Sequence, residues 1–211
     1  MASQEGHIDV VKSLVHNDSE IETRNDKGAT ALYSAGNKGH VEVVQFLIKN
    51  HADVNACDND GESSLLLAVF GGHTDVVCAL VSAGADVNLQ RNDGNSPLII
   101  ASQEGHTDIV ELLIHYGAEI EIHNNNGATP LYWAACKGHV EVVQFLIKNY
   151  ADVNACNNDG QSCLLRAVCG GHNNVVSALV SARADVNLQR NDGDSPLIIA
   201  NLLVTEDTLI L

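Results

Sequence analysis

Apolar residues recur at helical spacing within a short motif that the chain repeats. The segment 138–148 carries apolar side chains at positions i, i+1, i+4 and i+5, which are Val142, Val143, Leu146 and Ile147. This spacing places them on one stripe of an amphipathic helix that begins near Val140. The same eleven residues stand at 39–49, so the chain predicts the same helix twice.

A second short helix is predicted just before this one. Asn125-Asn126-Gly127 is typical of a turn in which glycine supplies a positive φ. Thr129-Pro130 follows, and threonine is a good N-cap while proline suits the first helical position. The helix is expected to run to Cys136 and to stop at Gly138. The unit is therefore a turn, a short helix, a second short helix and an extended connection over 149–158.

This unit recurs along the chain at a fixed period. Gly-His pairs begin at Gly6, Gly39, Gly72, Gly105, Gly138 and Gly171, each 33 residues after the last. A fixed period of this size indicates a stacked array of one supersecondary unit. Neither helix would be stable alone, since each has only about two to three turns. Helix pairs are expected to begin near Thr30, Ser63, Ser96, Thr129 and Ser162, with a last helix at Ser195-Pro196.

The unit resembles the ankyrin repeat. The resemblance rests on the pattern Asn-Gly-x-Thr-Pro-Leu-x-x-Ala-x-x-x-Gly-His-x-x-Val-Val-x-x-Leu-Ile-x-x-x-Ala-Asp-Val-Asn and covers nearly the whole chain. It implies an all-α solenoid of stacked helix-turn-helix units with projecting β-hairpin loops. We expect a single array over 1–211, with an incomplete first unit at 1–24, units near 25–57, 58–90, 91–123, 124–156 and 157–189, and a partial last unit at 190–211.

One family feature is missing from every unit. The histidine that usually follows Thr-Pro-Leu is replaced by Tyr33, Leu66, Ile99, Tyr132, Leu165 and Ile198. In the family this imidazole ties one layer to the next through hydrogen bonds. Losing one hydrogen bond costs about 1 kcal/mol, so we expect modest stability.

The sequence also repeats over a longer period than 33 residues. Residues 2–101 and 101–200 align without a gap at a shift of 99, with about three in four positions identical. This indicates that a block of three units was duplicated whole. Terminal units of such arrays need a polar outer face, whereas the last unit here continues into Leu202, Leu203 and Val204. We expect a piece of a longer array, a truncated gene model, or a cap helix that begins at 205–208.

Composition narrows the range of partners. The formal net charge is −16, which would repel a phosphate backbone and argues against nucleic acid. A basic protein partner fits this charge, although solubility alone also explains it. No run of 18 apolar residues exists and the N-terminus is polar, so we expect no membrane insertion and no signal peptide. The six cysteines form no CxxC motif, which favours reduced thiols and a cytoplasmic or nuclear location.

The histidines do not predict a metal site or an active site. Six of the ten belong to the Gly-His pairs, which a stacked array would space roughly 10 Å apart, the usual separation of packed helices. Donors at that spacing cannot share one ion. A solenoid offers a broad groove instead of one convergent pocket, and no GxGxxG or P-loop is present. We therefore expect no catalysis, no cofactor and no metal.

The predicted function is a non-catalytic scaffold that binds another protein through the concave face of fingers and first helices. The chain is expected to be monomeric unless its uncapped ends associate. The candidate contact residues are Arg24, Ser34, Asn37, Asp60, Leu67, Phe70, Asn92, Asn95, Gln103, Glu104, His123, Tyr132, Trp133, Lys137 and Arg166. Trp133 is the only tryptophan, and tryptophan, tyrosine and arginine dominate interface hot spots. It is either an anchor for a partner or a partly buried packing residue.

Two other interpretations of the array stay open. In the first interpretation, the array is a passive spacer or targeting segment of a larger protein. In the second it is a substrate or decoy of the asparaginyl hydroxylase of oxygen sensing, which acts on ankyrin repeats. The second rests on an asparagine eight residues after a leucine, at Asn55, Asn88, Asn154 and Asn187. The simpler interpretation of these asparagines is that they form turn hydrogen bonds.

Overall fold

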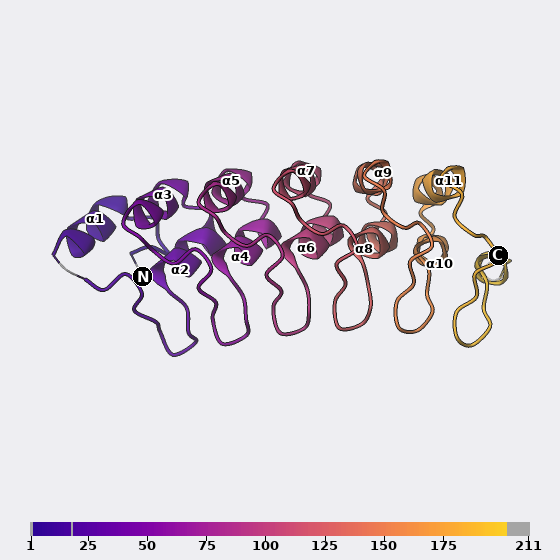
Figure 1. Ribbon diagram of the computed structural model, residues 1–211, viewed down its shortest axis with the longest axis horizontal. Helices are drawn as coiled ribbons and strands as arrows, with labels where there is room; N and C mark the ends of the chain where they lie inside the picture. The colour runs from indigo at the N-terminus through magenta and orange to yellow at the C-terminus, as the bar shows by residue number, and fades with distance from the viewer. Residues whose placement is uncertain (1, 18, 202–211) are drawn as a thin grey trace, which may run out of the picture.

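The computed structural model describes residues 2–17 and 19–201 and forms one elongated stack of layers (Figure 1). Each full layer holds an inner helix, an outer helix and a projecting loop. The inner helices are α2 (Ala31–Lys38), α4 (Ser64–Phe70), α6 (Pro97–Glu104), α8 (Pro130–Lys137) and α10 (Cys163–Cys169). The outer helices are α1 (Ile8–His16), α3 (Val41–Lys49), α5 (Thr74–Ser82), α7 (Thr107–His115), α9 (Val140–Lys148) and α11 (Asn173–Ser181).

The helices lie in two rows, with the loops below the inner row (Figure 1). We call these loops fingers; they comprise residues 24–29, 57–62, 90–95, 123–128, 156–161 and 189–194. The predicted hairpin character of the fingers is slight. Within the described part of the chain it amounts to two isolated antiparallel bridges, between Cys57 and Ser63 and between Cys156 and Ser162.

Local chemistry sets the start of every inner helix. The hydroxyl of each N-cap residue accepts a hydrogen bond from the backbone N–H three positions later, at 3.2–3.3 Å. Such caps satisfy N–H groups that a helix leaves without a partner in its first turn. The N-caps are Thr30, Ser63, Ser96, Thr129 and Ser162, as predicted.

The Gly-His pairs form the corner between inner and outer helices. Gly138 ends α8 in the left-handed conformation, with φ 81°, and His139 is the N-cap of α9. The ring N–H of His139 donates to the carbonyl oxygen of Gln103 in the preceding layer, at 2.9 Å. His40, His73 and His172 make the same contact 36 residues back. Four of the six predicted loop histidines thus have a structural role that links layers.

The core runs through the whole stack as a thin sheet of aliphatic side chains. Leu131, Ala134 and Ala135 of α8 and Val143 and Leu146 of α9 are all fully buried. Both alanines are fully buried in α8, which packs against the neighbouring inner helices α6 and α10. Because each layer packs only on its neighbours, burial is continuous along the stack and no central core forms.

The last described residues begin another inner helix. Helical backbone runs over 196–201, which places its start at Pro196 as predicted. Leu202, Leu203, Val204 and the proposed cap helix at 205–208 lie outside the described residues. Within the described residues, no helix is both long and apolar enough to cross a membrane.

Candidate partner-binding surface

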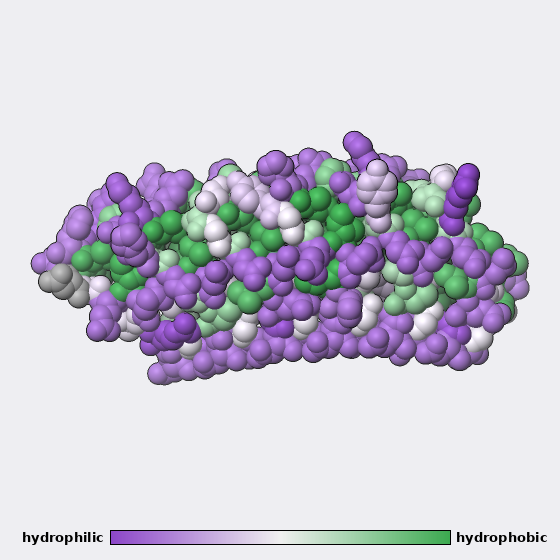
Figure 2. Space-filling view, in the orientation of Figure 1, coloured by the Kyte–Doolittle hydropathy of each residue, from purple (hydrophilic) through white to green (hydrophobic). Residues whose placement is uncertain are grey.

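The inner helices and the fingers together make one continuous face, which we call the inner face. Figure 2 shows the fingers as a hydrophilic band along the lower edge of the molecule, with hydrophobic residues above it. Every predicted contact residue belongs to this face, because each comes from a finger or an inner helix. Their accessibility differs greatly, and this decides which of them a partner could contact.

The fingers are joined side by side through their asparagines. The backbone N–H of Asn125 donates to the Asp93 carbonyl oxygen at 3.1 Å, and its side-chain amide donates to the Asn92 carbonyl oxygen, also at 3.1 Å. Asn59, Asn92, Asn158 and Asn191 repeat this pair of bonds on the finger before each of them. The row of fingers is therefore one hydrogen-bonded ladder. Sequence reasoning missed it, although an asparagine at every thirty-third position was its signal.

An apolar groove lies in the first half of the inner face. Leu67 and Phe70 of α4 line a cavity of about 260 Å³ together with Asn37, Glu62, Leu66, Arg91 and Ile100. Phe70 is 60% exposed, whereas the other two phenylalanines, Phe46 and Phe145, are half-buried. We call this feature the Phe70 groove.

Charged side chains frame the Phe70 groove. Arg91 donates to the Glu62 carboxylate at 3.0 Å and to the Asp93 carboxylate at 2.7 Å. Arg91 lowers the pKa of Asp93 through this hydrogen bond. Asp60 is exposed at the tip of the same finger as Glu62. Arg91 is paired with Glu62 and Asp93, and Asp60 is a third carboxylate in the finger that carries Glu62, so these four residues together have a formal charge of −2.

The second half of the inner face has different chemistry at the same positions. At a shift of 99, Arg166 replaces Leu67 and Cys169 replaces Phe70. The Arg166 guanidinium donates to the Cys136 sulfur at 3.1 Å. A cation and thiols thus take the place of the apolar groove. The duplicated blocks share a backbone and a core but offer a partner two unlike surfaces.

Trp133 lies in α8, within the second half, and is half-buried. Its ring packs edge-on against Tyr132, with centroids 5.8 Å apart and an interplanar angle of 87°. The indole N–H is buried and has no hydrogen-bond partner within the described structure. Trp133 therefore combines the packing role with a partly accessible ring, and both interpretations of this residue stay open.

The predicted contact residues divide into three groups by exposure. Arg24, Asn37, Asp60, Phe70, Asn92, His123 and Lys137 are exposed, and Ser34, Leu67, Gln103, Glu104, Trp133 and Arg166 are half-buried. Asn95 and Tyr132 are buried in this structure, so little of either side chain is accessible to a partner. The Asn95 side-chain oxygen accepts from the Asn124 amide at 2.9 Å, inside the stack.

Tyrosine restores the layer-to-layer bond that the missing histidines would make. The Tyr132 hydroxyl donates to the Gln161 side-chain oxygen at 2.9 Å and accepts from the Asn157 amide at 3.3 Å. The Tyr33 hydroxyl contacts Asp58 at 3.0 Å in the next finger. The expected loss of an inter-layer bond is therefore wrong at these two positions. Elsewhere Leu66, Ile99 and Leu165 fill the site as buried apolar side chains.

The asparagines proposed for hydroxylation form a second ladder, along the connecting loops. The side-chain oxygen of Asn55 accepts from the Asp86 N–H at 2.8 Å. Asn88 and Asn154 make the same bond to Glu119 and Asp185. Asn187 is exposed in the last such loop. These bonds give the asparagines the turn role that the sequence also suggested, while their modification stays an untested prediction.

The cysteines and the possible metal ligands are the remaining reactive groups of the described residues. They contain no group of three or more His, Cys, Asp or Glu side chains placed to hold a metal ion. All six cysteines are free thiols. Cys163 is fully buried, and this burial raises the pKa of its thiol far above the usual range.

Comparisons with known proteins agree with this geometry. A family profile described as ankyrin repeats in three copies matches residues 1–91 and 83–157, and a profile described as ankyrin repeat matches residues 159–191. The crystal structure of the human ASB11 ankyrin repeat domain is similar, with a TM-score of 0.87 and 25% identity over 94% of this chain and 89% of that chain. A search of curated protein sequences gave no match. The chain belongs to the ankyrin repeat family.

Proposed function

We propose that this ankyrin repeat protein binds another protein through its inner face and has no catalytic activity of its own. Ankyrin repeats are generally protein–protein interaction modules, and their fold is typically non-catalytic. The observation that carries the proposal is the exposed Phe70 side chain in its groove. Exposed aromatic residues at the centre of a surface are typical anchors of protein interfaces.

The surroundings of the groove support a particular kind of partner segment. An apolar side chain of the partner would fill the space between Leu67, Phe70 and Ile100. Lysine or arginine next to it would face Asp60 and Glu62 on the rim. Charge complementarity of this kind raises association rates and fixes register. The fingers add little flexibility, because the asparagine ladder holds them together.

The duplication supplies a matched test. We expect the double variant Leu67→Arg/Phe70→Cys to fold normally, since the second block carries these residues at the equivalent positions. It should lose about 2 kcal/mol or more of binding free energy, a hot-spot loss, which is roughly thirtyfold in affinity. A partner is first captured on the immobilised protein, and its affinity for each variant is then measured by calorimetry. Circular dichroism checks the fold, and Tyr150→Ser on the loop after α9 is the control for surface change.

The reverse exchange tests the same proposal from the other side. Arg166→Leu/Cys169→Phe builds a second groove on the same backbone. We expect this variant to bind two copies of the isolated partner segment per protein chain instead of one. Unchanged affinity in the first variant, together with unchanged stoichiometry in the second, would rule the groove out as the anchor site.

A further inference from the structure

The inner face of the four central layers divides into two halves that differ in charge. The inner helices α4, α6, α8 and α10 of these layers follow one another along the stack (Figure 1). We call α4 and α6, with the fingers at 57–62 and 90–95, the acidic half. We call α8 and α10, with the fingers at 123–128 and 156–161, the basic half.

The formal charge is −4 in the acidic half and +1 in the basic half, with histidine neutral. The charged residues of the acidic half are Asp58, Asp60, Glu62, Arg91, Asp93 and Glu104. Those of the basic half are Lys137, Asp159 and Arg166. A partner that lies along both halves therefore meets negative charge at one end and positive charge at the other.

The duplication shows that the fold does not require this division. At a shift of 99, the positions of Asp58 and Glu62 carry Asn157 and Gln161. The turn bonds of the two fingers are the same, because one side-chain oxygen of residue 58 or of residue 157 accepts from two backbone N–H groups at 2.9–3.1 Å. An amide serves the turn as well as a carboxylate does, so the charge of each half is available for binding.

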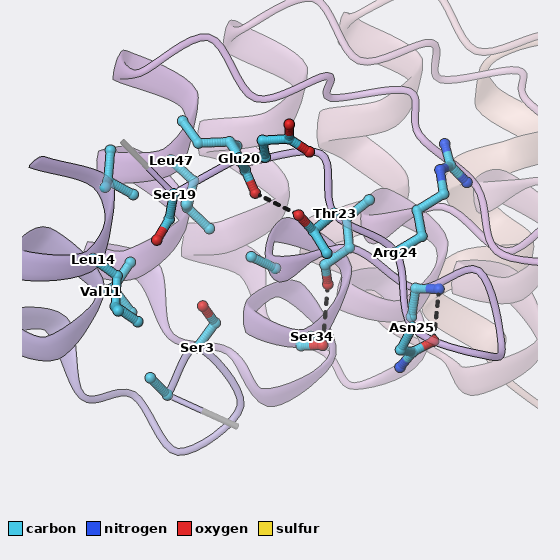
Figure 3. Close-up of a pocket in the computed structure, with 16 residues that line it drawn as sticks. Ser3, Val11, Leu14, Ser19, Glu20, Thr23, Arg24, Asn25, Ser34 and Leu47 are labelled. Carbon is cyan, nitrogen blue, oxygen red and sulfur yellow. Dashed lines mark hydrogen bonds between the residues drawn. The ribbon is translucent and has the colours of Figure 1, made fainter. Parts of the chain in front are cut away.

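Arg166 in the basic half differs from the other arginines of the inner face in what it binds. Arg91 and Arg190 pair with carboxylates. Arg24, which Figure 3 shows at the edge of a pocket of about 600 Å³ beside α1, donates to two backbone carbonyl oxygens. Within the described residues, the side chain of Arg166 donates only to the Cys136 sulfur, at 3.1 Å, and its Nε has no partner. Arg166 therefore keeps N–H groups that a partner could use.

Trp133 adds a second donor beside this arginine. Residues three apart on a helix lie on one face, so Trp133 is a neighbour of Cys136, which the Arg166 guanidinium contacts from α10. The indole N–H also has no partner within the described residues. The site offers donors, and the group that complements them is a carboxylate, which only accepts and can take two N–H groups of one arginine.

We propose that the partner is an extended segment with a charged residue of opposite sign at each end, bound along the inner face in one orientation. Its Lys or Arg, next to an apolar residue, lies at the Phe70 groove, and its Asp or Glu pairs with Arg166. This inference rests on the proposed function and names the chemistry of its partner. The reverse orientation places like charges against both halves and is disfavoured.

The spacing of the two charges in the partner follows from the stack. The Phe70 groove and Arg166 are two to three layers apart, and packed helices are separated by about 8–10 Å, which gives roughly 20–30 Å. An extended chain advances about 3.3 Å per residue, so roughly six to nine residues separate the basic and the acidic residue.

Selection from random peptides displayed on phage tests this motif without a known partner. The peptides are long enough to span both halves and are panned against the immobilised full chain. We expect the enriched peptides to carry Lys or Arg beside an apolar residue, and Asp or Glu at that spacing, always in the same order. An enriched peptide in which the acidic residue is changed to its amide should bind about tenfold more weakly, the usual loss for a bond to a charged group.

Variants of the basic half identify the residue that is read. Arg166→Leu carries the residue of Leu67 at the equivalent position, and it should bind the acidic peptide and its amide form equally. In Lys137→Glu/Arg166→Glu, selection should replace the acidic residue by Lys or Arg and keep the other end of the motif. Lys49→Glu/Lys148→Glu is the control, because it makes the same change of charge at exposed positions in the last turns of α3 and α9. It should select the same peptides as the wild type, and circular dichroism checks the fold of each variant.

Two outcomes would overturn this inference alone. The first is a set of enriched peptides with no acidic residue at a fixed spacing, and the second is an acidic preference that Arg166→Leu leaves unchanged. Failure of the proposed function gives a different result, since the peptides would then bind Leu67→Arg/Phe70→Cys as tightly as the wild type. Enrichment of no peptide at all would contradict both.

Discussion

At the scale of single residues, polar side chains at the repeat period hold one layer to the next. The fingers use the side-chain amide of asparagine, the corners use the histidine ring, and the connecting loops use a side-chain oxygen. In two connecting loops that oxygen comes from a glutamate, since Glu22 bonds the N–H of Asp53 and Glu121 bonds that of Asp152. Each of these bonds joins only two neighbouring layers, so the loss of one should destabilise the stack locally.

The finger glycines allow neighbouring fingers to come this close. Gly94 has a φ of 81°, and a Cβ built there would lie 2.7 Å from the Asn125 backbone nitrogen. We expect Gly94→Ala to destabilise the fold by about 1–2 kcal/mol from its left-handed conformation alone, with a further loss from the displaced finger. Urea unfolding measures the total.

Gly117 is the matched control for this substitution. Its φ is 90°, and no atom of the described chain lies within 4 Å of a Cβ built there. Gly117→Ala should therefore show the conformational cost without the displacement. Equal losses in the two variants would mean that contact between fingers contributes nothing.

Tyr132 gives the molecule a dependence on alkaline pH. Burial raises the pKa of Tyr132 to about 12, an effect that the nearby Arg166 partly offsets. The folded state therefore keeps the proton more strongly than the unfolded state, whose tyrosine pKa is about 10. The stabilisation by neutral Tyr132 is complete below pH of about 10 and is lost as pH rises toward 12.

The variant Tyr132→Phe tests this dependence. At neutral pH it should cost about 1 kcal/mol, because the bonds to Gln161 and Asn157 are lost. The difference in unfolding free energy between wild type and variant should narrow and then change sign as pH rises from about 9 to about 12, because the raised pKa corresponds to more than about 1 kcal/mol. A difference that stays constant over this range would show that Tyr132 does not titrate as its burial requires. Tyr150→Phe serves as the exposed control.

At the scale of helices, the ends were easier to predict than the burial of polar side chains. Thr129-Pro130 and Gly138 fixed the limits of α8, since N-caps and left-handed glycines act through bonds to residues three to five positions away. The burial of Asn95 was not predictable in the same way. Its partner Asn124 lies 29 residues along the chain, and nothing in the apolar period identifies such a pair.

The candidate site was predicted only in outline. The inner face followed from the family resemblance, and Leu67 and Phe70 were named as first-helix residues on that face. The groove between them depends on how Arg91 from the next finger turns toward Glu62, which is a contact between layers. Tyr132 was taken for a contact residue because of its type, although its hydroxyl is used within the stack.

The caps make a prediction at the scale of one helix. Ser63 is buried, and its hydroxyl accepts from the Leu66 N–H at 3.2 Å at the start of α4. Ser63→Ala should cost about 1 kcal/mol, the usual effect of losing an N-cap. Thermal or urea unfolding would show it, with Ser177→Ala on the exposed side of α11 as the control. Equal stability of the Ser63 variant and the wild type would mean that α4 is held by packing alone.

At the scale of the whole molecule, the two rows of helices have different roles: the outer row packs the layers together, and the inner row forms the inner face. In the outer row α3 and α9 are identical between the blocks, whereas α5 and α11 differ at three positions and α1 and α7 at five. The inner face changes between the blocks, from the Phe70 groove to the Arg166 and Cys136 pair. Because each layer depends mainly on its neighbours, side chains on the inner face can change without altering the rest of the stack.

The most direct test of this account is a hydrogen-exchange footprint of the protein with its captured partner. We expect protection to increase in the inner helices α4, α6 and α8 and in the fingers at 57–62 and 90–95, with little change in the outer helices α5, α7 and α9. Protection centred on the outer helices, with the inner helices and fingers unchanged, would contradict it.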